Sequence, residues 1–413
     1  MRILFLSNLY PPNAVGGYER LCFEMASALA ARQHEVAVLT SDHGGETADY
    51  PGQRIRRTWK LAVGKRAIYE PFEGSAAEKQ AVDAHNIACL DEEMRAFAPD
   101  VLFVWNLFFL DTSLLRTIEK QRRPTVFLLT DNWMIVFLNA GFWHSYFTEH
   151  VLDGTHSWLR RLWLRMSRGG SSLSKPRFHL GGSAIFASRF METLYRDAGI
   201  TFSDSTVIHH GVTDSSAVPR VARDRFLVRG EVRLLLAGRV VEVKGMHTAI
   251  DALPRIAARL PDRRILLTIV GDQGDPQYLQ RLRDQIRRLD LDDRVRIQPP
   301  VVENELPALF SAHDIFLFPS LYEPFSLTLI HALRAGIPTV ASDAGGNVEI
   351  VSDGRTGRVF RRADVRSLAN QVVQLAHDDG LRAAVAEGGR RIAAEYTFSR
   401  MVDQVERYLE SRR

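Results

Sequence analysis

The sequence predicts an α/β protein built from two doubly wound domains of the Rossmann type. Three observations support this prediction. Short apolar runs alternate with amphipathic stretches, the same alternation restarts near residue 232, and glycine-containing loops follow several of the apolar runs. Strands separated by helices require right-handed crossovers, so each domain should hold a parallel sheet covered on both faces.

The first half begins with a strand predicted for residues 2–7, a short apolar run that suits a buried parallel strand. A helix follows, with Leu21, Met25 and Leu29 on one face. Further strands are predicted for residues 35–40, 101–105, 125–129 and 184–187. Residues 125–143 are apolar enough to suggest a membrane span, but Thr130-Asp131-Asn132 interrupts them, and an ionisable residue inside a span is costly. We therefore predict a buried strand, a polar loop and the start of another element there.

The second half shows the same alternation of predicted strands and helices. Strands are predicted for residues 232–237, 265–270, 295–297, 315–319 and 339–342, and helices for residues 246–259 and 278–289. Residues 214–225 have no clear periodicity and contain Pro219, so they are predicted to link a domain of residues 1–213 to one of residues 226–397. Ligands of such sheets bind beyond the carboxyl ends of the strands, which predicts a site in a cleft between two facing domains.

Composition excludes several classes of protein. Of 413 residues, 46% are apolar and 25% are charged, as in ordinary globular proteins. The formal net charge of +4 is too small to indicate nucleic acid. Cys22 and Cys89 lack metal-ligand spacing and are predicted to be buried thiols in a reducing cytoplasm. The first apolar run is too short for a signal peptide and ends at Pro11-Pro12, so we expect a cytoplasmic protein.

The first motif joins the first strand to the first helix and contains Gly16-Gly17 within Pro11–Arg20. Its glycines allow close approach of the backbone, and the helix start offers unpaired N–H groups to an anion. A plain tight turn explains the same residues equally well. The dinucleotide fingerprint G-x-G-x-x-G is absent after this strand, which counts against a nicotinamide-dependent dehydrogenase.

The second motif follows the first strand of the second half and contains Arg239 and Lys244. A guanidinium binds two phosphate oxygens as a fork, while an ammonium acts as a point charge. Together they could neutralise a departing diphosphate. The alternative is two solvated surface cations, and the position between a strand and a helix favours the functional interpretation.

The third motif, residues 322–331, follows the strand predicted for residues 315–319 and contains Glu323. A carboxylate at the end of a strand can accept hydrogen bonds from sugar hydroxyls, and the N–H groups of the next helix can hold phosphate. The fourth motif, residues 341–349, is another glycine-rich turn after a strand.

These four motifs, in this order, resemble the retaining GT-B glycosyltransferases of family four, which includes bacterial cell-surface sugar transferases. The resemblance spans nearly the whole chain and includes residues 32–36, 187–190, 207–212, 269–272 and 353–357. It implies transfer of a sugar from a nucleotide-diphosphate donor to an acceptor hydroxyl of a glycan, a lipid-linked acceptor or a small molecule. It also implies that the last helix, residues 398–413, returns to the N-terminal domain, and that no metal or other cofactor is needed.

The resemblance assigns roles to particular residues. Arg239 and Lys244 would bind the donor diphosphate, and Glu323 would contact the hydroxyls of the donor sugar. The phosphates would meet the backbone amides of Phe325, Ser326 and Leu327, and Gly16-Gly17 would approach the diphosphate from the other domain. The triplet Asp290-Leu291-Asp292 lies in a polar connection, where solvated carboxylates explain it better than a metal site.

Two positions depart from the family pattern. The family's last motif is Glu-x7-Glu, with the second Glu on the ribose hydroxyls, and here that position is His331. A His that often precedes an Asp in the N-terminal domain is replaced by Thr130, which leaves the donor sugar open. Asp131 and Asn132 remain as candidates for the acceptor side. Asp131 could equally satisfy local backbone N–H groups.

Residues 154–191 contain seven basic residues, two tryptophans and no acidic residue before Glu192. Residues 158–177 therefore fit either peripheral contact with the inner face of an anionic membrane or an ordinary solvated helix. Three other functions stay open: a nucleotide-sugar epimerase, a phosphorylase on the same fold, and a non-catalytic sugar-nucleotide binder. For a transferase, the resemblance implies retention at the anomeric carbon. Because no carboxylate is recognised as a nucleophile of the kind that retaining glycosidases use, we expect the acceptor hydroxyl to attack the same face while Arg239 and Lys244 stabilise the leaving diphosphate, whose oxygens can take the acceptor proton.

Overall fold

The computed structural model describes residues 1–413 except 15, 65–67, 69, 71, 152–176 and 214–229. The predicted linker, residues 214–225, and the basic segment 158–177 apart from Arg177 lie outside the described residues. The described residues form two compact units. The first comprises residues 1–144, 177–209 and 401–413, and the second comprises residues 145–151, 210–213 and 230–400.

A parallel sheet of seven strands, in the order β3-β2-β1-β4-β5-β6-β7, forms the centre of the first unit. Its strands are β1 (Arg2–Ser7), β2 (Glu35–Ser41), β3 (Gln53–Trp59), β4 (Val101–Asn106), β5 (Thr125–Leu129), β6 (Phe178–Phe186) and β7 (Ile200–Val207). β1 pairs in parallel with both β2 and β4. The strand order therefore reverses between β1 and β4, where doubly wound sheets bind ligands.

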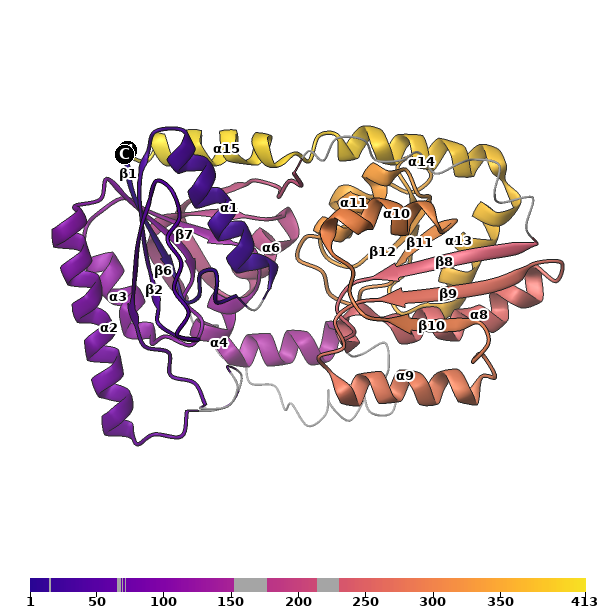
Figure 1. Cartoon of the computed structure of the whole chain (residues 1–413), viewed down its shortest axis with the longest axis horizontal. Helices are drawn as coiled ribbons and strands as arrows, with labels where there is room; N and C mark the ends of the chain where they lie inside the picture. Colours follow the sequence, from indigo (N-terminus) through magenta and orange to yellow (C-terminus); the bar gives the residue numbers. More distant parts are fainter. Residues whose placement is uncertain (15, 65–67, 69, 71, 152–176, 214–229) are drawn as a thin grey trace. The chain divides into compact units, whose positions relative to one another are not determined.

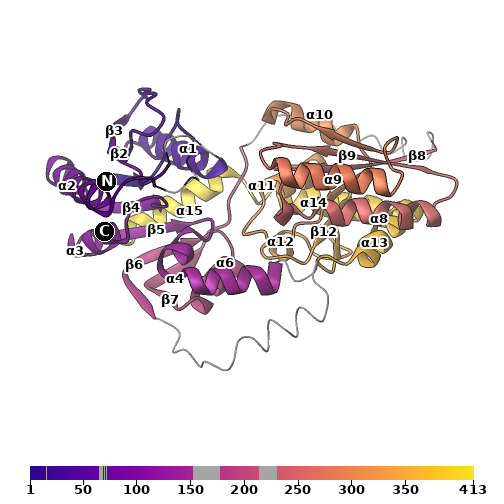
Figure 2. The same cartoon turned by 90° about the horizontal axis from the view of Figure 1, so that it is seen from below.

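Helices cover this sheet in both views (Figures 1 and 2). They are α1 (Gly17–Ala31), α2 (Ala76–Phe97), α3 (Thr112–Lys120), α4 (Trp133–Tyr146) and α6 (Arg189–Asp197). Ser75 caps α2 and Asp111 caps α3, each by accepting a hydrogen bond from a backbone N–H of the first turn. α4 is interrupted at Asn139, whose φ of −145° is not helical.

The last helix, α15 (Phe398–Glu410), packs on the first unit with its residues from Met401 onward. Arg32 pairs with Asp403 at 2.6 Å and with Glu406 at 2.5 Å. Further along the same helix, the Tyr408 hydroxyl donates to Asp204 at 2.7 Å. The chain therefore completes its N-terminal unit with its C-terminal residues, seen in yellow in Figure 1.

The second unit holds a parallel sheet of six strands in the order β10-β9-β8-β11-β12-β13. The strands are β8 (Glu231–Ala237), β9 (Arg264–Val270), β10 (Val295–Gln298), β11 (Ile315–Phe318), β12 (Thr339–Ser342) and β13 (Arg358–Phe360). The order reverses between β8 and β11, as it does between β1 and β4 in the first unit.

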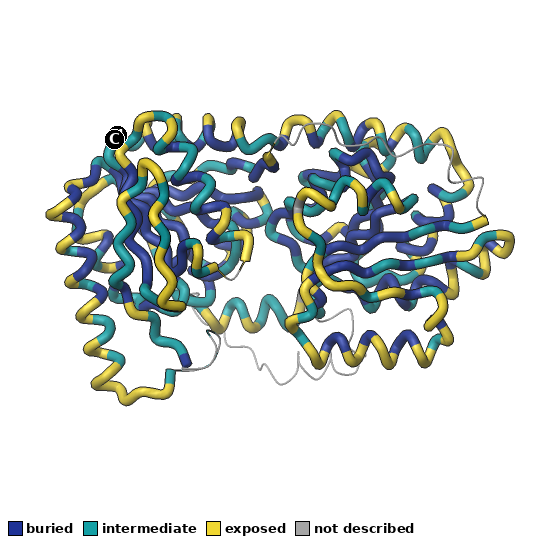
Figure 3. Tube along the Cα trace, viewed as in Figure 1, coloured by how far each residue is buried: buried dark blue, intermediate teal, exposed yellow. Residues whose placement is uncertain are grey.

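The helices of the second unit are α8 (Met246–Arg259), α9 (Pro276–Arg288), α10 (Leu306–Ser311), α11 (Leu327–Ala335), α12 (Asn347–Ile350), α13 (Val365–His377) and α14 (Asp379–Ala393). In each unit the burial is concentrated in the central strands, and the outer faces of the helices are exposed (Figure 3). Completely buried side chains of β8, β9 and α8 form the centre of the second core, as expected for a parallel sheet covered by helices.

The prediction of two doubly wound α/β domains is confirmed. Cys22 and Cys89 are free and buried, as predicted. The strand prediction was incomplete, because β3, β7 and β13 were missed and β6 begins at Phe178, before the predicted start at Ala184. In the described part of the chain, no helix combines the length and apolar character needed to span a bilayer.

Candidate active site

The loops after β8 and β11 meet closely in the second unit. Gly245 follows Lys244 with a φ of +65°, and a Cβ on it would lie only 2.0 Å from the carbonyl oxygen of Pro319, so a glycine is required there. The N–H of Leu321 donates to the carbonyl of Val243 at 2.7 Å. These contacts fix the loop that carries Lys244 against the loop that carries Glu323.

Lys244 and Glu323 form an ion pair at this junction. The Lys244 Nζ lies 2.6 Å from Glu323 Oε2, and the two side chains are 20% and 6% exposed. Ser320 Oγ donates to the same carboxylate oxygen at 3.3 Å. The ammonium also lies 5.6 Å from the centre of the Phe318 ring. A buried carboxylate needs such partners, so the two predicted residues hold each other in place.

Arg239 lies in the same unit, directly beyond Gly238 at the end of β8. Its side chain is exposed, and none of the described residues forms an ion pair with it at this position. The loop around it is anchored through its backbone, because the N–H of Val240 donates to the carbonyl of Asp272 at 2.8 Å. The guanidinium is therefore accessible to an anion that approaches the carboxyl end of the sheet.

The predicted phosphate-binding residues lie at the start of α11. Ser326 caps this helix, since its Oγ accepts a hydrogen bond from the Leu329 N–H at 3.1 Å. The first turn begins at Leu327, and its N–H groups and the helix dipole favour an anion. Phe325 is buried, with ring contacts to His210 and Tyr396. His331 is half-buried and lies one turn after Leu327, on the same face of α11.

In the first unit, Gly16 and Gly17 lie at the start of α1, beyond the carboxyl end of β1. Gly16 is the N-cap, and its N–H donates to Glu19 Oε2 at 2.9 Å, so the buried Glu19 carboxylate holds the glycine loop. A Cβ added to Gly17 would meet no described atom within 4 Å. The fold therefore does not demand a glycine at position 17, and the open space suits close approach of a ligand.

Tyr18 connects the start of α1 to the ends of β4 and β5. Its hydroxyl lies 2.6 Å from the carbonyl oxygen of Trp105 and 2.5 Å from that of Leu128, near the ends of β4 and β5. Burial raises the pKa of Tyr18 well above its usual value, so the hydroxyl stays protonated and can donate. Tyr18 and Glu19 were not predicted as site residues, although both lie within the first motif and Glu19 has the spacing of a capping box.

Asp131 lies in the loop after β5, and its environment is unusual for a carboxylate. Burial raises its pKa to about 6, a backbone hydrogen bond from Trp133 opposes that rise, and the charge of Glu19 adds to it. The hydrogen bond from the Trp133 N–H measures 2.9 Å, so Asp131 does have the local role that the sequence left open. Its neighbour Asn132 is half-buried, and its carbonyl accepts from Val136 at 3.1 Å.

The predicted residues therefore form two groups, one in each unit. Lys244 and Glu323 are in contact, and the start of α11 follows Glu323 directly along the chain. Gly16, Gly17, Asp131 and Asn132 lie beyond the carboxyl ends of β1 and β5. Three buried polar residues that support Glu323 were not predicted as site residues, and these are Ser320, Ser342 and Asn347. Hydroxyl and amide side chains are too common at strand ends to single these residues out.

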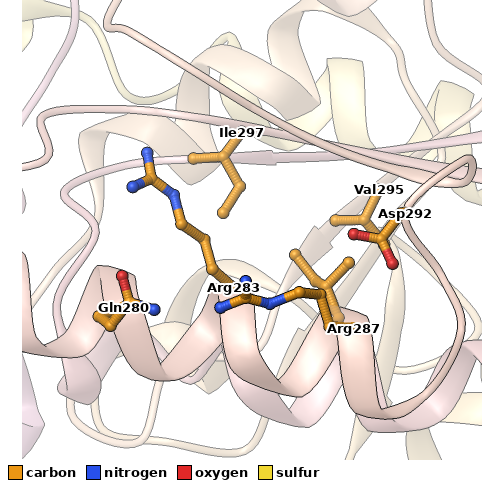
Figure 4. A pocket seen from close by; sticks show the side chains of 7 residues that line it. Gln280, Arg283, Arg287, Asp292, Val295 and Ile297 are labelled. Atoms are coloured by element: carbon orange, nitrogen blue, oxygen red, sulfur yellow. The ribbon is translucent and has the colours of Figure 1, made fainter.

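A separate cavity of about 450 Å³ lies between α9 and β10 and contains none of the predicted site residues (Figure 4). Arg283 and Arg287 of α9 line it together with Asp292, Val295 and Ile297. Asp292 belongs to the triplet Asp290-Leu291-Asp292, whose two carboxylates are exposed. This position agrees with the interpretation of the triplet as solvated loop residues.

Among the described residues, one group of metal-ligating side chains lies close enough together to hold an ion. It consists of His34, Glu406 and Glu410 in the first unit. Glu406 is already occupied, because Arg32 pairs with it at 2.5 Å and His34 Nε2 lies 2.7 Å from it. His34 Nδ1 in turn lies 3.1 Å from the amino group of Met1. We interpret these contacts as the polar anchor of α15.

Comparisons with known proteins agree over nearly the whole chain. The family model described as "Glycosyltransferase Family 4" matches residues 15–216, and the one described as "Glycosyl transferases group 1" matches residues 222–392. Glycogen synthase of Mycobacterium tuberculosis is 29% identical over 408 residues, which cover 96% of this chain and 92% of that protein.

Solved structures show the same fold. Sucrose-phosphate synthase from Thermosynechococcus elongatus superposes with a TM-score of 0.72 at 18% identity, covering 100% of this chain and 99% of that one. The Anabaena protein HepE in complex with UDP and glucose gives a TM-score of 0.64 at 22% identity, with 100% of both chains covered. At these identities the likeness concerns the fold.

Proposed function

The chain belongs to family four of the GT-B glycosyltransferases, and we propose that it is a retaining enzyme that moves a sugar from a nucleotide-diphosphate donor to an acceptor hydroxyl. The single observation that supports this proposal best is the Lys244–Glu323 pair, in which Glu323 lies in the loop that leads into α11. It combines a cation for a leaving phosphate, a carboxylate for sugar hydroxyls and a helix start for an anion.

The residues that bind the sugar donor have separate roles in this proposal. Lys244 and Arg239 stabilise the charge that develops on the departing diphosphate, and the first N–H groups of α11 hold its oxygens. Donor binding gives the Lys244 ammonium a phosphate oxygen as a second partner beside Glu323. The Glu323 carboxylate then has capacity to accept hydrogen bonds from the donor sugar.

The chemical step breaks the bond between the anomeric carbon and the diphosphate oxygen and forms a bond to the acceptor oxygen on the same face. The proton of the acceptor hydroxyl passes to an oxygen of the leaving diphosphate. The negative charge that develops on the diphosphate is thus stabilised by Lys244 and Arg239, and the diphosphate itself takes the acceptor's proton. The proposal therefore requires no metal ion.

The acceptor side of the proposal rests on the first unit. Asp131 and Asn132 follow β5, and the open space beside Gly17 lies at the start of α1. Asp131, with its pKa of about 6, is largely ionised near neutral pH and can accept a hydrogen bond from an acceptor hydroxyl. Gly16 and Gly17 allow the backbone to approach the donor phosphates closely.

The relatives support the same class of substrates. One relative is a glycogen synthase, and HepE was crystallised with UDP-glucose as well as with UDP and glucose. We therefore propose a nucleotide sugar as donor and a glycan, a lipid-linked acceptor or a small-molecule glycoside as product class. Membrane contact through residues 158–177, in a cytoplasmic protein at the inner membrane face, stays part of this proposal, and flotation with anionic liposomes tests it.

The proposal is tested by incubating the chain with nucleotide sugars and a broad acceptor panel and following the products by mass spectrometry. We expect a glycosylated acceptor and free nucleotide diphosphate, and we expect Glu323→Gln to suppress both. A sugar that changes configuration without acceptor would instead indicate an epimerase, and product formation that requires phosphate would indicate a phosphorylase. Nucleotide-sugar binding without turnover would indicate a binding protein.

A further inference from the structure

A buried chain of hydrogen bonds lies beneath the candidate donor site. Ser342, at the carboxyl end of β12, is completely buried, and its Oγ donates to the carbonyl of Ser320 at 2.6 Å. Because a hydroxyl has a single proton, Ser342 Oγ then accepts from Asn347 Nδ2, which lies 3.2 Å away. The same Nδ2 donates to the Ser342 carbonyl at 3.2 Å, so the orientation of the Asn347 amide is fixed.

This chain reaches Glu323 by two routes. Ser320, whose carbonyl is held by Ser342, donates its own hydroxyl to Glu323 Oε2 at 3.3 Å. Gly346, the residue before Asn347, donates its N–H to the Glu323 carbonyl at 2.9 Å. The ends of β11 and β12 and the start of α12 thus hold both the carboxylate and the main chain of Glu323.

The fold alone does not account for these polar side chains. Asn347 is 1% exposed, and its Oδ1 is buried with no hydrogen-bond partner among the described residues. A buried acceptor without a partner destabilises the folded state, whereas an apolar pair of similar shape would be close to neutral. A costly polar group beside a binding site is best explained by what it positions.

We propose that Ser342 and Asn347 are positioning residues that set the Glu323 carboxylate for the donor sugar. This inference rests on the proposed function, since it assumes that Glu323 binds sugar hydroxyls. Neither residue touches the substrate itself. The diphosphate has its own ligands in Lys244, Arg239 and the start of α11, so the loss of Ser342 or Asn347 should affect the sugar and spare the nucleotide diphosphate.

The test compares two changes in the same strand. Ser342→Ala removes the buried hydroxyl at the carboxyl end of β12. Thr339→Val is the matched control, because Thr339 is 1% exposed and its hydroxyl donates to the Ile337 carbonyl at 3.0 Å, at the opposite end of β12. Donor kcat/KM is measured by nucleotide release, and binding of the free nucleotide diphosphate is measured by calorimetry.

For Ser342→Ala we expect kcat/KM to fall about 10- to 100-fold, the range known for the loss of residues that orient the ligands of metal sites. Its affinity for nucleotide diphosphate should stay within about twofold of wild type, because the phosphate ligands are untouched. Thr339→Val should match wild type in both measurements. Asn347→Asp replaces the amide N–H group that faces Ser342 with a carboxylate oxygen, which cannot donate a hydrogen bond. It should also lower kcat/KM while sparing diphosphate affinity, and it replaces Ser342→Ala in the test if that variant does not fold.

Two outcomes would overturn the positioning role. One is wild-type turnover in Ser342→Ala and Asn347→Asp, and the other is a fall in diphosphate affinity that matches the fall in kcat/KM. A failure of the proposed function has a different signature, because the wild type would then transfer no sugar at all. An active wild type with an impaired Glu323→Gln and an unchanged Ser342→Ala would reject the positioning role alone.

Discussion

At the residue scale, Lys244 and Glu323 neutralise each other before any donor is present. Their 2.6 Å contact lies largely out of solvent, where an unpaired carboxylate would be strongly disfavoured. The sequence predicted both residues, but it did not predict that they form a pair, because their 79-residue separation gives no signal of contact. An anion that enters the site meets a cation already placed beside the end of β11.

Lys244→Ala should lower kcat by about 10²–10³, the usual loss when one preorganised charge-stabilising group is removed. Turnover is measured at saturating donor, on protein whose folding has been verified by circular dichroism. Arg283→Ala, an exposed arginine of α9 outside the site, is the control and should match wild type. Near-normal turnover of the Lys244 variant would remove this residue from the mechanism.

His331 should contact the ribose of the donor less firmly than the Glu of the family pattern. A neutral imidazole accepts one hydrogen bond, while a carboxylate can accept from both ribose hydroxyls. His331→Ala should therefore weaken binding of nucleotide diphosphate by about 0.5–1.5 kcal/mol in calorimetry. His331→Glu should bind at least as tightly as wild type. Unchanged affinity of His331→Ala for nucleotide diphosphate would show that His331 does not contact the ribose.

Asp131 should make stability depend on pH in a direction opposite to that of a salt-bridged carboxylate. Its pKa is about 6 in the folded chain, against about 3.9 in an unfolded one. Between these values the folded state keeps a proton that the unfolded state has lost, so this residue's contribution to stability falls as pH rises from about 4 to about 6. Well above pH 6, Asp131 is ionised in both the folded and the unfolded state, and its contribution to stability no longer changes with pH.

The Asp131→Asn side chain does not titrate, so this variant does not lose stability as Asp131 ionises, and its amide oxygen can still accept from the Trp133 N–H. Its thermal midpoint, followed by tryptophan fluorescence, should exceed that of wild type by more at pH 7.5 than at pH 4.5. Asp292→Asn, an exposed carboxylate in the second unit, should show no such pH-dependent difference. A difference between Asp131→Asn and wild type that stays the same at both pH values would refute the raised pKa.

At the scale of elements, the central strands were predictable, whereas the edge strands β3, β7 and β13 were not. β1, β5 and β12 are buried along nearly their whole length, and their predicted bounds match the structure. The edge strands β3 and β7 are mostly polar, with sequences Gln-Arg-Ile-Arg-Arg-Thr-Trp and Ile-Thr-Phe-Ser-Asp-Ser-Thr-Val. An edge strand is covered less completely than a central one, so it lacks the continuous apolar run used to recognise buried parallel strands.

α15 is the element whose place in the fold depends most on the rest of the molecule. Its residues Val405 and Leu409 are completely buried in the first unit, although the whole second unit precedes them in sequence. The sequence shows the amphipathic pattern of this helix, but the pattern does not say which sheet the apolar face covers. That expectation came from the family resemblance.

Leu409→Ala should destabilise the first unit by about 2–5 kcal/mol, the range for a buried Leu truncated to Ala. The described tryptophans, Trp59, Trp105, Trp133 and Trp143, all lie in the first unit, so their fluorescence reports on that unit. The urea midpoint by fluorescence should therefore fall for Leu409→Ala. Leu375→Ala, an equally buried change in α13 of the second unit, should leave that midpoint near the wild-type value. The reverse pattern would contradict the assignment of α15.

At the scale of the whole molecule, the two sheets have the same winding, and each carries candidate residues after a strand beside its reversal of strand order. Gly16 and Gly17 follow β1, beside the reversal in the first sheet, and Asp131 follows β5, which β4 separates from that reversal. Arg239 and Glu323 follow β8 and β11, beside the reversal in the second sheet. The sequence predicted this arrangement because both the strand ends and the polar residues after them are local features. The supporting contacts, such as Ser342 with Ser320, depend on long-range pairing.

The central claim is retaining transfer from a nucleotide-diphosphate sugar, and it can be tested before the acceptor is known, because water can replace the acceptor. Wild-type protein is incubated with uridine, adenosine and guanosine diphosphate sugars in the presence of EDTA, and the anomeric protons are followed by NMR before mutarotation. We expect α-linked donors to release nucleotide diphosphate and the α-anomer of the sugar, and we expect Lys244→Ala to slow this release. Initial release of the β-anomer, or release that requires an added divalent metal, would contradict it.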